Sequence, residues 1–435
     1  MIDSLLAWKL QNGVFPVVVY ALSAIALVAL AVKSPRKKWL PIQLLGALIG
    51  VGIGYLLAWL VSDVWNTFGI SLTPLTRLWF GLGVGGMGFA IAGLWKSRLW
   101  RTILAATSVF LFALMGAVGV NADIAEFPTL GSALGVSSIA RLDLPASSPR
   151  PTPASAAVAT LAASWIPPAD LPKAGTVGSV IIPATVSHFA ARTAIVYLPP
   201  AALVKNAPRL PVVEMLAGQP GSPANLITSG ALATILDGYA SQHAGLAPIV
   251  VMPDQLGAPQ LNPMCVDSPL GNSATYLTVD VPNWIHSHLH VLSDRKYWAI
   301  GGFSQGGTCS IQLGAKYSGL YGSILDISGQ LAPHRGSVAS TIAAAFGGST
   351  AAYTGASPAG LLSAGTPYAD TLGIFAVGQT DTRFDGAAVA VSEAARAAGM
   401  TVHYMQSPGT AHDWHTVQFA IRQSLPLLYA RWGLS

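Results

Sequence analysis

Four long stretches without a charged residue, all in the first part of the chain, constrain its fold more than any other feature. They cover residues 10–32, 39–62, 78–95 and 102–122 and are 23, 24, 18 and 21 residues long. A helix of about 20 apolar residues crosses the hydrocarbon core of a bilayer. The chain as a whole, with 52% hydrophobic and 9% charged residues, is too apolar for an ordinary soluble protein. We therefore predict four transmembrane helices in residues 1–122.

The basic residues between these stretches predict the orientation of the helices. Two clusters follow the first and third stretches, namely Lys33, Arg36, Lys37 and Lys38, and then Lys96, Arg98 and Arg101. The connection between the second and third stretches holds a single basic residue, Arg77. Basic loops favour the cytoplasmic side. We expect a multi-pass protein of the cytoplasmic membrane, with the N-terminus and everything after residue 122 outside the cytoplasm.

The overall positive charge does not indicate nucleic-acid binding. The chain has a formal net charge of +5, but residues 1–122 carry +7 and the remainder carries −2. The basic character therefore belongs to the predicted membrane region and its topology. The bilayer is the expected partner, no nucleic acid is expected, and the sequence identifies no protein partner.

The remaining residues divide into a linker and one folded domain. Residues 123–174 are rich in Ala, Pro and Ser, which predicts a semi-extended linker. In residues 175–435, β-rich apolar runs alternate with helix-length segments. The runs are "TVGSVIIP", "TAIVYLP", "LPVVEML", "APIVVMPD", "KYWAIGGF", "YGSILDIS", "LGIFAVG" and "VHYMQ". This alternation predicts an α/β domain with a mostly parallel sheet and helices on both faces.

A glycine–serine–glycine motif marks the predicted catalytic centre. Residues 302–306 read "GFSQG" and lie between the strand "KYWAIGGF" and the helix "SQGGTCSIQLGAKY". A sharp strand-to-helix turn of this type exposes the serine hydroxyl, and Cβ atoms two residues to either side would collide. The motif predicts Ser304 as a nucleophile.

The partners of this serine should follow it in the chain in the order acid, then histidine. His412 lies in a loop between the last strand and the last helix and is the preferred base, with His415 as the alternative. Asp381, just after the strand "LGIFAVG", is the preferred acid. Asp385 and Asp326 remain open as alternatives, and Asp385 could equally begin the next helix.

Two backbone N–H groups should stabilise the oxyanion of a tetrahedral intermediate. One is expected from Gln305, directly after the nucleophile. The other is expected from the loop "AGQPGSPAN", in which Gly218 or Gln219 is the predicted donor.

The two cysteines, Cys265 and Cys309, are both predicted to lie outside the cytoplasm, where an even pair favours a disulfide. The stretch "IHSHLH" holds His286, His288 and His290, but it has no acidic or cysteine ligand nearby. It does not predict a metal site, and no cofactor is implied.

These motifs resemble a known family. The segment "CVDSPLGNSATYLTVDVPNWIHSHL" followed by "GGFSQGG" is similar to the putative-esterase branch of the α/β-hydrolases, which includes esterase D-like enzymes and mycolyltransferases. The resemblance spans about residues 210–432. It implies an α/β-hydrolase fold with Ser304 as nucleophile, His412 as base and an acid at or near Asp381. The trehalose-binding residues of mycolyltransferases find no match.

The sequence therefore predicts a membrane-anchored actinobacterial serine esterase that acts on a lipid or cell-envelope ester. Two alternatives stay open. An acyltransferase would use the same triad with a different acceptor, and a binding module would keep the fold without the chemistry.

Overall fold

The computed structural model describes residues 2–32, 35–66, 69–136, 139–144, 161–365 and 368–435. The contacts within the chain divide it into two compact units, residues 1–137 and 138–435. Each unit is described by itself.

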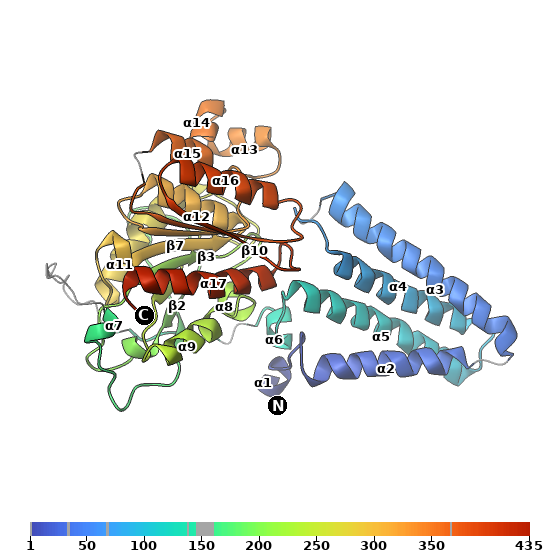
Figure 1. Ribbon diagram of the computed structural model, residues 1–435. Helices are drawn as coiled ribbons and strands as arrows, with labels where there is room; N and C mark the ends of the chain where they lie inside the picture. The colour runs from blue at the N-terminus through green and yellow to red at the C-terminus, as the bar shows by residue number, and fades with distance from the viewer. Residues whose placement is uncertain (1, 33–34, 67–68, 137–138, 145–160, 366–367) are drawn as a thin grey trace. The chain divides into compact units, whose positions relative to one another are not determined.

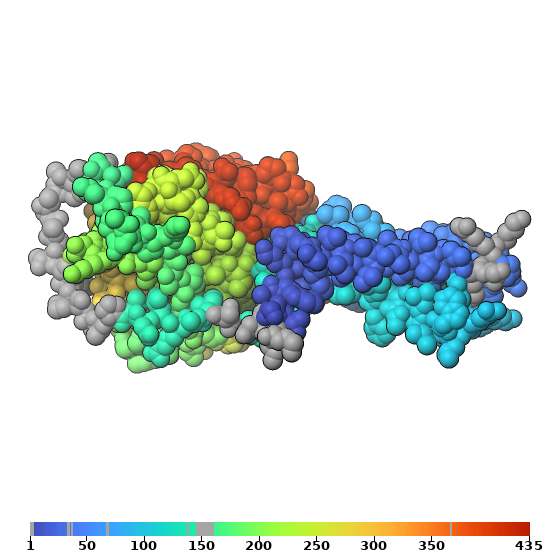
Figure 2. Space-filling view, turned by 90° about the horizontal axis from the view of Figure 1, so that it is seen from below, coloured from blue at the N-terminus to red at the C-terminus, as the bar shows by residue number. Residues whose placement is uncertain are grey.

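The first unit, which we call the helical unit, contains four helices that are long and apolar enough to cross a membrane, as predicted. Its elements are α1 (Ile2–Leu6), α2 (Val14–Ala31), α3 (Arg36–Trp59) with a π-helical continuation (Leu60–Val64), α4 (Pro74–Leu94), α5 (Leu99–Ile124) and α6 (Leu130–Ala133). Helix α4 packs along both α3 and α5, and α2 packs along α5. Helix α2 is seen in dark blue on the face of the helical unit that Figure 2 shows.

Three of these helices begin earlier than the charge-free stretches indicate, and α3 begins at Arg36 rather than at residue 39. Helix α4 begins at Pro74, where the hydroxyl of Thr73 accepts a hydrogen bond from Thr76 N, and it includes Arg77. Helix α5 begins at Leu99 and includes Arg101. The predicted stretches were ended at the first charged residue. A helix can nevertheless include a charged side chain near its end when that side chain is paired. The Arg77 guanidinium lies 2.7 Å from the Asp63 carboxylate.

Arg101 is satisfied by backbone carbonyls. Its guanidinium donates to the carbonyl oxygens of Leu30 and Val32 at 3.0 and 2.9 Å, at the C-terminal end of α2. The last carbonyls of a helix have no intrahelical partner and carry partial negative charge, so a guanidinium there stabilises the helix end.

Glycines line the contact between α3 and α4. A Cβ built on Gly46 would lie 2.7 Å from the carbonyl oxygen of Gly88, and one built on Gly54 would lie 2.9 Å from the Cα of Gly81. Gly50 packs against Val84 and Gly85 in the same way. Only glycine permits such a close approach of two backbones, as is common between helices in membranes.

The second unit, which we call the sheet unit, is built on an eight-stranded sheet (Figure 1). Its strands are β1 (Thr176–Val180), β2 (Ala194–Leu198), β3 (Val212–Leu216), β4 (Ile249–Met252), β7 (Trp298–Phe303), β8 (Ser323–Ile327), β9 (Leu372–Gly378) and β10 (Thr401–Ser407). Seven of them fall within the predicted runs, and β10 extends one residue beyond the run "VHYMQ" at each end. A separate two-stranded ribbon, β5 (Asp267–Ser268) and β6 (Gly271–Asn272), was not predicted.

The strand order is β1-β2-β4-β3-β7-β8-β9-β10. The pairs β1–β2 and β2–β4 are antiparallel, and all the other pairs are parallel. The predicted mostly parallel sheet is therefore confirmed. Because β7, β8, β9 and β10 are adjacent and parallel, the loops after them meet at one edge of the sheet.

Helices cover both faces of the sheet (Figure 1). The α-helices are α7 (Leu161–Ser164), α8 (Asn225–Thr228), α9 (Leu232–Gln242), α10 (Ser273–Thr275), α11 (Val281–His288), α12 (Gln305–Lys316), α13 (Val338–Ala345), α14 (Thr350–Gly355), α15 (Pro358–Ala364), α16 (Asp385–Ala397) and α17 (Trp414–Trp432). Short 3-10 or π-helical turns cover Pro200–Ala202, Tyr276–Asp280 and Arg295–Tyr297. Helices α12 and α16 lie on one face, whereas α9 and α17 pack together on the other.

Parts of the predicted linker belong to the sheet unit. Leu142 N donates to Ser179 O of β1 at 2.9 Å, and the indole of Trp165 donates to Ala244 O at 2.9 Å. Residues 145–160 lie outside the described residues, so the semi-extended linker stays a prediction. Helix α5 continues to Ile124, two residues past the predicted end of the membrane region.

Candidate active site

Ser304 lies at the turn between β7 and α12, where the motif places it. Its φ of 58° and ψ of −115° are strained for a residue with a side chain. A Cβ built on Gly302 would lie 2.9 Å from the Cα of Gly306, and one built on Gly306 would lie 2.5 Å from the carbonyl oxygens of Leu216 and Ala217. Both glycines are therefore required by close backbone contacts, as the motif predicts. The turn leaves the serine side chain half-buried at the edge of the sheet.

The loops after β9 and β10 bring an acid and a histidine together. Nδ1 of His412 lies 3.0 Å from Oδ2 of Asp381, and both side chains are almost fully buried. Oδ1 of Asp381 accepts a hydrogen bond from Phe384 N at 3.2 Å. Because an ionised carboxylate only accepts hydrogen bonds, it favours the tautomer with the proton on Nδ1 and leaves Nε2 of His412 able to accept a proton.

Two aromatic rings hold the imidazole beside the nucleophile turn. The ring of Phe384 stacks on His412 with centroids 4.0 Å apart. The ring of Phe303, the residue before Ser304, lies 4.8 Å from the His412 ring. The imidazole therefore packs against the strand end that carries the predicted nucleophile.

The alternative acids have other surroundings. Asp385 accepts hydrogen bonds from the Tyr404 hydroxyl at 2.7 Å and from Gln406 Nε2 at 2.9 Å, both on β10. Asp326 is buried below the turn, and burial raises its pKa to about 7. Its Oδ1 has no hydrogen-bond partner in the part of the chain that the structure describes. Asp381 alone of the three is paired with His412.

The other histidines differ from His412 in their exposure or in their contacts. His334, His403 and His415 are exposed. In the stretch 286–290, the His286 ring packs on Trp298, while Nδ1 of His288 and Nδ1 of His290 lie 3.0 Å from the carbonyl oxygens of Trp284 and Ala207. Among the described residues there is no cluster of three or more His, Cys, Asp or Glu side chains that could hold a metal.

The loop predicted to supply an oxyanion donor, residues 217–225, follows β3 and lies beside the nucleophile. We call it the oxyanion loop. A Cβ built on Gly218 would lie 3.5 Å from the Cβ of Ser304 and 3.3 Å from the Phe303 ring. Within the described residues, the backbone N–H groups of Gly218, Gln219 and Gln305 donate to no protein acceptor. Donors without an acceptor at this position suit an incoming oxyanion.

The predicted disulfide is confirmed. Cys265 and Cys309 are bonded, with Cα atoms 5.6 Å apart. Cys309 lies on α12, five residues after Ser304, so the bond ties the loop after β4 to the helix that begins at the nucleophile.

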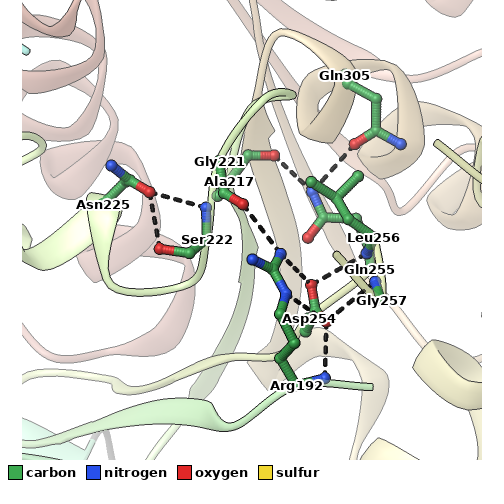
Figure 3. A network of polar contacts seen from close by, with 10 residues as sticks. All are labelled: Arg192, Ala217, Gly221, Ser222, Asn225, Asp254, Gln255, Leu256, Gly257 and Gln305. Atoms are coloured by element: carbon green, nitrogen blue, oxygen red, sulfur yellow. Dashed lines mark hydrogen bonds and ion pairs between the residues drawn. The ribbon is translucent and has the colours of Figure 1, made fainter. Parts of the chain in front are cut away.

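One set of polar residues near the site was not predicted. Gln255 donates to the Ala217 carbonyl of the oxyanion loop, and Arg192, which is paired with Asp254, donates to the Gly221 carbonyl (Figure 3). A signal exists for one of them, because Asp254 directly follows an apolar run and polar residues at the carboxyl ends of parallel strands gather at one edge. Nothing in the sequence pairs it with Arg192, which is 62 residues away.

The chain belongs to the family whose model is described as putative esterase, which matches residues 190–419. An uncharacterized protein of Corynebacterium glutamicum is 31% identical over 421 residues, covering 95% of this chain and 94% of that protein.

A solved structure supports the fold. A ferulic acid esterase superposes with a TM-score of 0.51 at 18% identity, covering 59% of this chain and 98% of its own. An S-formylglutathione hydrolase from Agrobacterium tumefaciens reaches a TM-score of 0.49 at 20% identity, covering 60% of this chain and 96% of its own. The α/β-hydrolase fold predicted for residues 175–435 is confirmed, and the family supports an esterase type of activity.

Proposed function

We propose that the protein is a membrane-anchored serine esterase that hydrolyses a carboxylic ester of lipid or cell-envelope origin outside the cytoplasm. The observation that supports this most directly is the buried pair of Asp381 and His412, which packs against the strand end that carries Ser304.

The proposed reaction follows from these positions. Oγ of Ser304 attacks the ester carbonyl while Nε2 of His412 takes the hydroxyl proton, and Asp381 stabilises the resulting imidazolium. The N–H groups of Gln305 and of Gly218 or Gln219 stabilise the negative oxygen. The alcohol leaves with the proton from His412, and a water molecule then hydrolyses the acyl-serine with the same histidine as base.

A labelling experiment tests the nucleophile. The full chain in detergent is treated with a fluorophosphonate probe, which reacts with activated serines. We expect labelling of the wild type and of Ser310→Ala, which removes a control hydroxyl on the helix α12 that follows Ser304. We expect no labelling of Ser304→Ala. An unlabelled wild type would favour the binding module, and a labelled Ser304→Ala variant would place the nucleophile elsewhere.

The membrane part of the proposal rests on the four apolar helices and on the basic loops. An anchored enzyme works on esters within its reach, so a chain without residues 1–137 should hydrolyse an ester embedded in vesicles more slowly than the full chain. Equal rates would contradict a membrane substrate. If hydroxyl acceptors are added to the same assay, formation of their esters reveals acyl transfer.

The side of the membrane is tested separately. A protease added to intact cells should cleave the sheet unit if this unit lies outside the cytoplasm.

A further inference from the structure

The oxyanion loop is held at both ends by side chains that come from elsewhere in the chain, the buried Gln255 and the partly buried Arg192 (Figure 3). Nε2 of Gln255 donates to the carbonyl oxygen of Ala217 at 2.5 Å. Nη2 of Arg192 donates to the carbonyl oxygen of Gly221 at 2.9 Å. These two carbonyls lie on either side of Gly218 and Gln219, the predicted oxyanion donors.

A hydrogen bond that fixes a backbone carbonyl also fixes the direction of the N–H in the same peptide group. The peptide group is planar, and in the trans form its C=O and N–H point in opposite directions. The bond from Gln255 to Ala217 O therefore fixes the direction of the Gly218 N–H. The same relation is visible at the far end of the loop. While Gly221 O accepts from Arg192, the N–H of Ser222, in the same peptide group, donates to Asn225 Oδ1 at 2.7 Å.

Asp254 holds the guanidinium of Arg192 in one orientation. Its fully buried carboxylate accepts two hydrogen bonds from the Arg192 side chain, at 3.0 Å from Nε and 2.7 Å from Nη2. It also accepts from the backbone N–H groups of Arg192, Leu256 and Gly257 at 2.7, 3.1 and 3.0 Å. A two-point contact with a carboxylate gives a guanidinium one orientation.

Gln255 connects the two halves of the predicted oxyanion hole. Besides Ala217 O, its Nε2 donates to Oε1 of Gln305 at 3.0 Å. The side chains of Gln255 and Gln305 are both buried, and Nε2 of Gln305 donates in turn to Asn262 Oδ1 at 3.0 Å. One carboxamide thus fixes the peptide before Gly218 and the side chain of the residue that follows Ser304.

We propose that Gln255 and the Arg192–Asp254 pair are positioning residues that hold the oxyanion donors in place before substrate binds. This inference rests on the proposed esterase function. Such donors act on the transition state far more than on the bound ester, and they do so only when they are fixed in advance. Loss of the support should therefore lower kcat and leave KM nearly unchanged.

The decisive variant is Gln255→Leu, which keeps the approximate size of the side chain and removes both hydrogen bonds. With p-nitrophenyl butyrate as substrate we expect kcat to fall about 10- to 100-fold, less than for loss of a direct donor. KM should change by less than about 2-fold. Affinity for a boronic acid, whose adduct on Ser304 places an oxygen in the oxyanion hole, should fall by the same factor as kcat. The pH profile should keep its shape, because the network does not contact His412.

The matched control is Gln312→Leu. Gln312 is equally buried on α12 and donates to a backbone carbonyl, that of Ala356, at 2.9 Å, but it lies outside the network. This variant should keep both kcat and boronic acid affinity. If Gln255→Leu does not fold, Arg192→Lys decides the question. The lysine keeps a positive charge beside Asp254 but cannot donate to Asp254 and Gly221 together, so kcat should fall about 3- to 10-fold with a parallel loss of boronic acid affinity.

The outcomes separate the two proposals. Suppose that the wild type is active and that Gln255→Leu, or Arg192→Lys where that variant decides, keeps the kcat and the boronic acid affinity of the wild type. This result overturns the positioning role and leaves the esterase proposal standing. Equal losses in Gln255→Leu and Gln312→Leu would also overturn it, because they would show a general effect of a lost buried hydrogen bond. A wild type that neither hydrolyses esters nor binds fluorophosphonate overturns both.

Discussion

The helical unit and the sheet unit place their apolar side chains in opposite ways. In the helical unit large apolar residues face outward, and Val14 and Phe110 are 79% and 78% exposed. In the sheet unit the largest side chains are inside, and Trp298 and Tyr321 are almost fully buried. The first pattern suits a hydrocarbon solvent and the second suits water.

The two units also treat polar groups differently. In the helical unit, charged side chains pair near helix ends, as Arg77 does with Asp63. The sheet unit buries carboxylates at the candidate site, those of Asp381 and Asp254, together with the carboxamide of Gln255. Buried polar groups are costly unless they are hydrogen-bonded, and their concentration around Ser304 favours a chemical role for this unit. The comparison leads us to expect that each unit has its own stability and that the chemistry belongs to the sheet unit, and the following experiments test both expectations.

The largest effect is expected from Asp381→Asn in the sheet unit. The amide can stabilise the wrong tautomer of His412, so kcat for ester hydrolysis should fall by about 10³- to 10⁴-fold with little change in stability. Asp385→Asn is the control and should lose less than about 10-fold, since Asp385 contacts Tyr404 and Gln406 and not the histidine. Steady-state kinetics measures both variants. A larger loss of kcat in Asp385→Asn than in Asp381→Asn would assign the role of the triad acid to Asp385.

The next effect is expected from the disulfide. Cys265 and Cys309 close a loop with a sequence separation of 44, so replacing both with alanine should lower the unfolding free energy of the sheet unit by about 4 kcal/mol. The chain has two cysteines, so the helical unit has none. Thermal unfolding with and without a reductant should shift the transition of the sheet unit alone. A shift in both units would mean that they do not unfold independently.

A smaller effect is expected from Gly50→Leu in the helical unit. The new side chain would meet the backbone of α4 at Val84 and Gly85, and overpacking of this kind costs about 1–3 kcal/mol. Gly52→Leu is the control, because a Cβ there meets nothing within 4 Å. We expect Gly50→Leu to lower the melting temperature of the helical unit in detergent and to leave kcat unchanged. A loss of kcat would show that the units are coupled.

The smallest effect is expected from a change of a single pH unit. Burial raises the pKa of Glu214 to about 8 from its ordinary 4.5, opposed by a hydrogen bond from Tyr321. Between these two values the folded state holds a proton that the unfolded state releases. The unfolding free energy of the sheet unit should therefore fall as pH rises, by up to about 1.4 kcal/mol per pH unit.

Denaturation at several pH values measures this slope. Glu214→Gln should remove part of it, and Glu393→Gln, at an exposed position, should not. Asp326, with its pKa raised to about 7, contributes in the same direction between its ordinary value and pH 7. A stability that rises with pH over this range would contradict the neutral state of both buried acids.

Much of the fold could be predicted because the signals are local. Eight apolar runs became the eight strands of the sheet, and the turn around Ser304 is specified by Gly302 and Gly306. Asp381 could be predicted to lie at the carboxyl edge of the sheet because it directly follows the apolar run that forms β9. Helix ends were less predictable, since Arg77 and Arg101 continue helices that charge alone would end.

The support of the oxyanion loop could not be predicted, because it depends on contacts between distant segments. Gln255 contacts Ala217 and Gln305 across 38 and 50 residues. No spacing in the sequence records such contacts, and glutamine is common on surfaces. The contact of Asp381 with His412 likewise joins segments that are 31 residues apart.

The glycine-lined contact of α3 and α4 limits how these two helices can evolve. Where two backbones touch, a methyl group gained on one helix cannot be offset by a smaller residue on the other, because none is smaller than glycine. Gly46, Gly50 and Gly54 are therefore expected to resist mutational drift, while their outward-facing neighbours can exchange freely among apolar residues. In the helical unit, conserved positions should follow this single stripe.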